Sequence, residues 1–173
     1  MSAAPLLDGI GPGAAVLVVG TPRYEVPTEV KRHEIDAPAT VGVLRGALAT
    51  PREPELFDAA LIHDWGRDVL LTELVEATRH AVRDEGRIAF VAPIARAGWR
   101  GARGALIGVL RGRRPIPLED LCGALLLGGC VDVRARDIED AAGLSMVWAR
   151  VPSGTREDVE SSSIRSTGNG SAL

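Results

Sequence analysis

Three adjacent residues, His63, Asp64 and Trp65, are of types that can do chemistry and follow an apolar segment. A histidine can act as a general base near neutral pH. An aspartate can orient a substrate amine, and a tryptophan can form the wall of a pocket. In a structural alternative, Asp64 begins a turn and Trp65 packs on the edge of a sheet. His63 and Asp64 are therefore the candidate catalytic residues.

The residues in front of this trio predict the element that would position it. Residues 57–63 form a short apolar run that ends in polar side chains, which is typical of a buried strand. Ligands of open α/β sheets bind at the carboxyl ends of the strands. The sequence therefore places His63 at the edge where a ligand would bind.

A second apolar run, residues 14–20, predicts a central parallel strand that ends at Gly20. The glycines at 9, 11 and 13 precede this strand, whereas a dinucleotide-binding fingerprint must follow a strand and open a helix. No such fingerprint follows any predicted strand, so an oxidoreductase of the NAD type is the weakest alternative.

The rest of the chain predicts alternating strands and helices. The further strands are expected at 30–36, 40–44, 87–92, 131–136 and 144–151, and the helices at 68–83 and 118–127. Pro93 is expected to close the strand before it, and Gly86 to stop the helix before it. This order favours an α/β fold with a mostly parallel sheet. The last two strands have a short link, which favours an antiparallel pair.

Composition limits the function less than the fold. The chain has 173 residues, 46% hydrophobic and 25% charged, which is typical of one globular domain. A net charge of −3 and a pI near 5.6 give no general attraction to nucleic acid or anionic membranes. The three histidines suggest no metal site, and Cys122 and Cys130 are expected to be buried, reduced thiols.

Three regions are expected along the chain. Residues 1–13 are a flexible lead-in, 14–152 form the α/β domain, and 153–173 are a disordered tail rich in Ser and Gly. We see neither the pattern of a signal peptide nor an apolar run of roughly 20 residues, so a cytoplasmic location is expected.

Residues 86–118 contain seven arginines and no acid. On a helix, Arg96, Arg100 and Arg103 would share one face. This face could grip a carboxylate or phosphate, or dock on the acidic surface of a protein partner. A solvated basic face is the structural alternative. RNA is a less favoured ligand, because Trp99 is the only aromatic residue between Arg96 and Arg114.

The order and spacing of four segments resemble a class I S-adenosylmethionine (SAM) dependent methyltransferase over residues 6–151. These segments are 12–20, 45–51 with 57–62, 70–93, and 118–150. The resemblance implies a Rossmann-like fold. Its seven-stranded, mostly parallel sheet would have helices on both faces and an antiparallel C-terminal strand. It also implies SAM as a possible cofactor.

The resemblance assigns cofactor-binding positions to five residues, which are Gly20, Thr21, Asp36, Ala47 and Leu48. Asp36, at the end of the second predicted strand, would accept hydrogen bonds from the ribose hydroxyls. Alternatively, Asp36 is a solvated turn acid close to a proline. Ala47 and Leu48 belong to the loop on the adenine side.

The chain departs from the family at several of these positions. Val18 stands where the family has an acid, Pro22 and Tyr24 stand where it has loop glycines, and Ala47 replaces the adenine-side acid. A side chain in a left-handed conformation costs about 1–2 kcal/mol. A lost charge-assisted hydrogen bond costs roughly 1.5–3 kcal/mol more. Together these changes weaken SAM binding by about two or three factors of ten.

A further departure follows the second strand, where residues 36–40 are too few for the usual helix before the third. The sequence thus predicts a methyltransferase-like domain with an altered SAM loop that serves as a non-catalytic binding or assembly module. The alternative is an active SAM-dependent methyltransferase acting on a small molecule.

Overall fold

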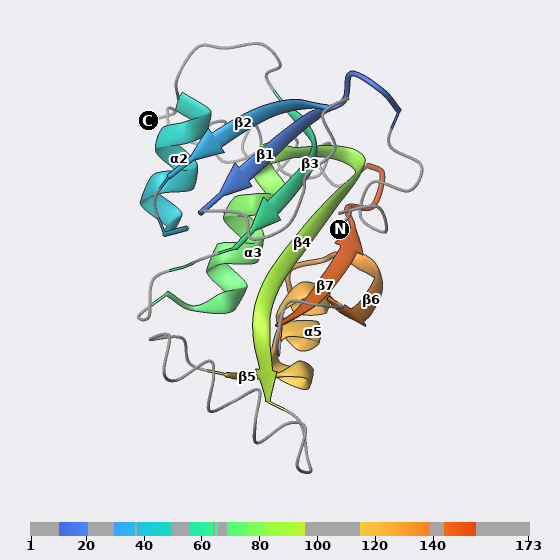
Figure 1. Ribbon diagram of the computed structural model, residues 1–173. Coiled ribbons are helices and arrows are strands. Elements are labelled where there is room, and N and C mark those ends of the chain that lie inside the picture. The colour runs from blue at the N-terminus through green and yellow to red at the C-terminus, as the bar shows by residue number, and fades with distance from the viewer. Residues whose placement is uncertain are drawn as a thin grey trace, which may run out of the picture.

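A computed structural model describes residues 11–20, 30–36, 38–49, 56–63, 65, 69–95, 115–138 and 144–154, with side chains omitted at 47–49. Within these residues the chain forms a seven-stranded sheet beside three helices (Figure 1). The strands are β1 (Ala15–Val19), β2 (Lys31–Ile35), β3 (Phe57–Ile62), β4 (Val82–Ala95), β5 (Ile116–Pro117), β6 (Val131–Asp137) and β7 (Leu144–Arg150). The helices are α2 (Val41–Ala49), α3 (Leu71–Ala81) and α5 (Leu118–Leu127).

The strand order is β2-β1-β3-β4-β7-β6, and the short β5 pairs with the end of β4. Strands β2, β1, β3 and β4 are parallel neighbours, whereas β7 is antiparallel to both β4 and β6. The mostly parallel sheet with an antiparallel C-terminal strand is therefore confirmed.

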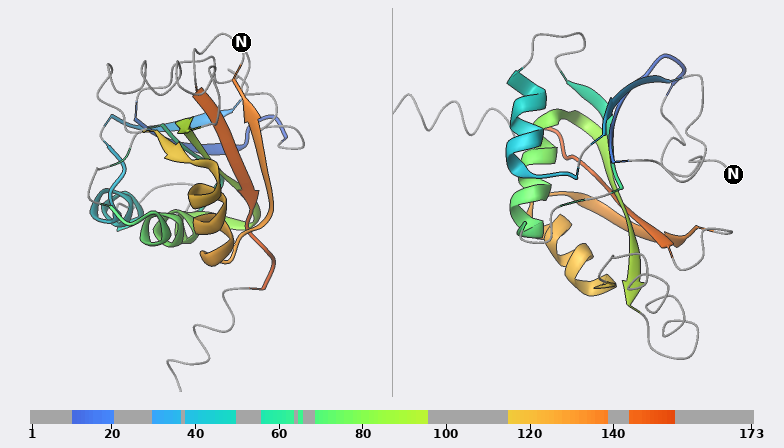
Figure 2. Two further views of the ribbon diagram at one scale, coloured as in Figure 1. Left: turned by 90° about the horizontal axis from the view of Figure 1, so that it is seen from below. Right: turned by 60° about the vertical axis from the view of Figure 1, so that its left-hand side comes forward.

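The three described helices cover one face of the sheet (Figure 2). Their apolar side chains, among them Leu44, Leu74 and Leu125, pack with Leu17 and Phe90 of the sheet in one core. Burying such a side chain contributes about 1.5–3 kcal/mol. Helix α3 has the apolar spacing that the sequence showed, and α5 occupies the predicted range.

The second face of the sheet is also covered. Val16, Val18, Leu61 and Val91 point to this face and are fully or almost fully buried. Buried side chains on both faces explain why β1 is continuously apolar and why β3 is apolar apart from Asp58. None of the described helices packs on this second face.

The prediction of a strand at 40–44 is wrong, because α2 begins there. Thr40 caps this helix: its Oγ1 accepts a hydrogen bond from the Val43 amide at 3.1 Å. Leu44 is fully buried against α3 and the sheet. The cap and this burial outweigh the strand preference of the valines. The segment expected as a loop from 45 is thus helical as far as Ala49. Because α2 lies between β2 and β3, the expected absence of a helix after the second strand is also wrong.

Strand β4 is longer than predicted at both ends. Val82 already pairs with Phe57, so α3 ends at Ala81 rather than at residue 83. Pro93 does not close the strand. Pairing with β3 ends at Phe90, while Pro93 still lies opposite a residue of β7. A proline without an N–H is tolerated where one side of the strand has no ladder partner.

Gly86 lies in an irregular part of β4 rather than at a helix end. A Cβ atom at this position would come within 2.8 Å of two backbone oxygens, those of Arg83 and Asp58. The neighbouring Glu85 has a left-handed φ of 63°. These two oxygens leave no room for a Cβ atom, so only glycine fits at residue 86.

The described part of the chain ends at residue 154, inside the segment expected as a tail. The Ser153 hydroxyl donates to Glu85 Oε1 at 2.5 Å, and the Gly154 amide donates to Asp84 Oδ2 at 3.0 Å. Residues 155–173, like residues 1–10, lie outside the described ranges. None of the described helices is long and apolar enough to cross a membrane.

Both cysteines are free thiols. Cys130 is buried as expected, whereas Cys122 on α5 is only half-buried. Burial raises the pKa of both thiols, so neither has the lowered pKa of a reactive cysteine.

Candidate functional site

The carboxyl ends of the first three parallel strands bring three of the predicted site residues to one edge. The Gly20 amide donates to the Ile35 carbonyl at 2.9 Å, and the His63 amide donates to the Val19 carbonyl at 2.9 Å. Gly20, Asp36 and His63 therefore follow three neighbouring strands, in the order β2-β1-β3. This is the edge at which open α/β sheets bind their ligands.

Gly20 provides the sharp exit from β1. Its φ is +83°, a conformation that residues with a Cβ rarely adopt. The backbone here can therefore approach a ligand closely. The next position, Thr21, lies outside the described residues.

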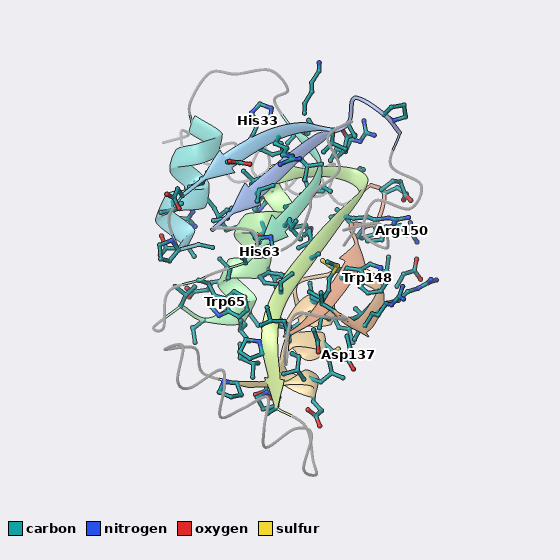
Figure 3. All side chains as sticks on the ribbon, in the orientation of Figure 1. His33, His63, Trp65, Asp137, Trp148 and Arg150 are labelled. Atoms are coloured by element: carbon teal, nitrogen blue, oxygen red, sulfur yellow. The ribbon has the colours of Figure 1, made fainter. Side chains whose placement is uncertain are left out.

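His63 lies at the end of β3 (Figure 3). Its exposed fraction is only 2%. It follows Leu61 by two residues, so it is on the second face of the sheet, away from the described helices. A buried imidazole needs an opening beside it to exchange a proton with a substrate. The burial of His63 thus weighs against an accessible general base.

Trp65 serves a structural purpose. Its ring meets Phe90 edge to face, with centroids 5.7 Å apart, and packs against the core. Its backbone forms an isolated parallel bridge with Ala39, near the start of α2. The packing of Trp65 on the end of the sheet is the structural alternative foreseen from the sequence. Asp64, between the two, lies outside the described residues.

Asp36 is exposed and directly follows β2. An exposed carboxylate there can accept hydrogen bonds from a pair of hydroxyls or be solvated in a turn. Ala47 and Leu48 lie near the end of α2, and only their backbone is described. Arg96, Arg100 and Arg103 are outside the described ranges, so the basic face remains a sequence prediction.

The position of the expected acid in β1 is apolar. Val18 is 0% exposed and packs in a cluster with Val16 and Ala59, and the half-buried Val30 lies against them. A carboxylate in this cluster would lose its hydration without a described partner to replace it. The end of β1 before Gly20 is therefore apolar on this face of the sheet.

Asp58 is a residue whose importance the sequence reasoning missed. Its Oδ2 accepts a hydrogen bond from the Ala15 amide at 2.6 Å, and its Oδ1 forms an ion pair with Arg83. The carboxylate ties the start of β1 to the start of β4. An acid within an otherwise apolar strand was the available signal.

A second cluster missed from the sequence lies around Arg150, at the end of β7. Its guanidinium contacts Glu85 Oε2 at 2.5 Å and Asp132 Oδ2 at 2.9 Å. Hydrogen bonds from Ser153 and Arg150 hold the pKa of Glu85 below its ordinary value. Both acids have left-handed φ angles, a conformation that residues with a Cβ rarely adopt.

No cluster of three or more His, Cys, Asp or Glu side chains suited to a metal ion occurs among the described residues.

Sequence comparison gives no assignment. No protein-family model matches the chain, and no curated protein matches it.

Solved structures with the same architecture are known. The SAM-dependent methyltransferase SibL, in its apo form, is 17% identical over 87% of this chain and 55% of its own, with a TM-score of 0.51. An O-methyltransferase family protein from Burkholderia thailandensis is 12% identical over 82% and 52%, with a TM-score of 0.52. A geranyl diphosphate methyltransferase in complex with SAM is 13% identical over 87% and 83%, with a TM-score of 0.51.

The chain spans about half the length of the first two of these proteins. At such low identity the likeness concerns the fold and not the reaction. Together with the strand order, it shows that this chain has the fold of the SAM-dependent methyltransferases.

Proposed function

We propose that this domain is a methyltransferase-like binding or assembly module that does not transfer methyl groups from SAM. The observation that carries the proposal is Val18, which is fully buried among Val16 and Ala59 where the resembled family has an acid. Such an acid accepts charge-assisted hydrogen bonds that are worth roughly 1.5–3 kcal/mol. A valine side chain accepts no hydrogen bond, so this stabilisation of SAM is lost.

The sequence after β1 supports the same conclusion. Pro22 and Tyr24 replace loop glycines, so one position lacks an N–H donor and the other carries a bulky ring. With the loss of the acid, these changes weaken SAM binding by about two or three factors of ten.

The length of the connection between β1 and β2 is a further argument. Residues 20–30 join strands that lie in register, with Ala15 opposite Lys31 and Val19 opposite Ile35. The chain must therefore return by about 13 Å, at roughly 3.3 Å per strand residue. A crossover helix of that length would use about nine residues and leave about two for its turns. This length disfavours the loop and helix at which α/β domains bind nucleotide cofactors.

The partner surface proposed from the sequence is the arginine group 96, 100 and 103, which suits a carboxylate- or phosphate-bearing surface. We further propose that the domain acts in the cytoplasm, beside an active enzyme.

One observation favours a second candidate, an active SAM-dependent methyltransferase acting on a small molecule. Gly20 keeps its positive φ, and Asp36 and His63 follow the neighbouring strands at the same edge. In this candidate Asp36 binds the ribose, and His63 and Asp64 position the acceptor. The SAM complex of geranyl diphosphate methyltransferase, which has the same fold, supports this alternative.

Equilibrium dialysis with radiolabelled SAM separates the two candidates. We expect no saturable binding to the wild-type chain in the micromolar range. If the domain is an enzyme, Tyr24→Gly removes bulk from the loop and should bind SAM as well as the wild type or better. Saturable wild-type binding that Asp36→Ala abolishes would overturn the proposal and favour the enzyme.

Binding to immobilised polyglutamate tests the basic face, with one variant pair on that face and a second pair at the carboxyl edge of the sheet. Arg100→Glu with Arg103→Glu should reduce retention, while Asp36→Ala with His63→Ala should leave it unchanged. Loss of retention in the second pair alone would contradict the module.

A further inference from the structure

The carboxyl edge of the sheet is closed by the chain's own backbone. Strand β1 lies between β2 and β3 and leaves the sheet at Gly20, level with Ile35 on one side and His63 on the other. Farther along, the extensions of β2 and β3 meet in a parallel bridge between Ala39 and Trp65. The two strands that flank β1 are therefore direct neighbours beyond its end.

This bridge narrows the space beyond β1. Two strands on either side of a third are two inter-strand spacings apart, about 10 Å, whereas bridged strands are about 5 Å apart. The gap that β1 leaves at Gly20 is thus halved at the level of Ala39. Ligands of open α/β sheets bind in a crevice at the carboxyl ends of the strands. In this chain, backbone closes the crevice at the end of β1.

The Trp65 side chain completes the closure. Its indole meets the Phe90 ring edge to face, with centroids 5.7 Å apart, and is only half-buried against the core. Ala39, its bridge partner, is 0% exposed. Val41, at the start of α2, and Val69, shortly before α3, are half-buried against the same core. An aromatic ring thus lies in an apolar setting just beyond the end of β3 (Figure 3).

We propose that Trp65 is an intramolecular plug, whose indole occupies the place that the planar base of a nucleoside takes when the crevice is open. The bridge to Ala39 holds the plug in position. Asp36 is exposed and belongs to the same connection as Ala39, so its carboxylate is placed to accept the ribose hydroxyls of such a nucleoside.

The proposal rests on the proposed function, because it gives a physical reason why this edge excludes SAM. It adds a separate claim, that removal of one side chain creates a nucleoside site. An apolar cavity of about 150 Å³, left by the truncation of a core side chain, binds benzene. The place of a truncated indole is therefore expected to accept a planar ring.

Thermal denaturation of Trp65→Ala with and without adenosine tests the plug. Loss of the ring should lower the melting temperature by roughly 5–15 °C. Adenosine at 100 times its dissociation constant should raise the melting temperature of the variant by roughly 5–10 °C and leave that of the wild type unchanged. Trp65→Val, which suits a bridged strand position and also lacks the ring, replaces the alanine variant if that variant has no cooperative transition.

Two controls separate a nucleoside site from a simple cavity. Trp148→Ala removes a half-buried indole of β7 that packs on the second face of the sheet, so adenosine should not stabilise this variant. Trp65→Ala combined with Asp36→Ala should still bind indole. Its affinity for adenosine should fall by about tenfold or more, because the ribose hydroxyls lose a charged acceptor.

Adenosine stabilisation that is confined to the Trp65 variants and depends on Asp36 would support the plug. Stabilisation by indole but not by adenosine would reveal a cavity without a ligand site and overturn the proposal, as would stabilisation by neither. Equal stabilisation of the wild type or of Trp148→Ala would overturn it as well. The failure of the proposed function has a different signature, which is saturable binding of SAM to the wild-type chain.

Discussion

Replacement of Asp58 by alanine should destabilise the domain more than any exposed charge change. The Asp58 carboxylate accepts the Ala15 amide at 2.6 Å, and Ala15 is only 6% exposed. Loss of this charge-assisted hydrogen bond costs about 1.5–3 kcal/mol. The Arg83 side chain of the ion pair is 63% exposed, so its contribution is below about 1 kcal/mol.

The expected total for Asp58→Ala is therefore about 2–3 kcal/mol. For a domain of this size it lowers the melting temperature by about 5–10 °C. Urea denaturation followed by circular dichroism measures the change directly. Arg83→Ala is the matched control, since it removes the ion pair and keeps the hydrogen bond to Ala15. The reasoning is refuted if Asp58→Ala lies within about 0.5 kcal/mol of the wild type. It is equally refuted if the two variants lose the same stability.

Two further predictions concern a helix cap and a titrating acid. Thr40→Ala removes the hydrogen bond from Val43 and should cost about 1 kcal/mol in urea denaturation, whereas Thr40→Ser should retain most of it. Hydrogen bonds from Ser153 and Arg150 lower the pKa of Glu85 in the folded state. Its contribution to stability is thus present above the ordinary value of 4.5 and is lost as the pH falls through the lower, folded-state value. The stability gap between wild type and Glu85→Gln should shrink over that range, and a gap that widens toward acid would contradict this assignment.

The sequence predicted the elements whose periodicity was strong. The apolar runs at β1 and β3, the α5 range and the antiparallel β6–β7 pair all appear in the structure as expected. For β1 and β3 the burial follows directly from the apolar side chains, since both faces of these two strands are covered.

The sequence failed where distant contacts decide local structure. The valines before Leu44 favour a strand, but Leu44 enters the core against α3 and the sheet. The Thr40 cap of this helix, three residues before Val43, is a local signal that the sequence reasoning overlooked. Pro93 looks like a strand end, but β3 has already stopped pairing at that level. The strained Glu85 depends on Arg150, which is 65 residues away. Such partners are not visible in local patterns.

The candidate site was predictable in position but not in detail. The carboxyl ends of the strands bring Gly20, Asp36 and His63 together as the strand assignments implied. The sequence could not show that His63 is buried or that Trp65 packs on Phe90. These facts depend on what covers the sheet, and they favour a structural role for Trp65 and weigh against His63 as an accessible general base.

The most direct test of the central claim is the melting temperature with and without millimolar SAM or S-adenosylhomocysteine. A ligand at 100 times its dissociation constant stabilises the folded state by about 2.7 kcal/mol. In a domain of this size that raises the melting temperature by roughly 5–10 °C. With Val18 buried in an apolar cluster and an altered loop, we predict a cooperative transition that neither ligand shifts. A shift of 5–10 °C, absent in Asp36→Ala, would contradict the account and assign the edge to an active cofactor site.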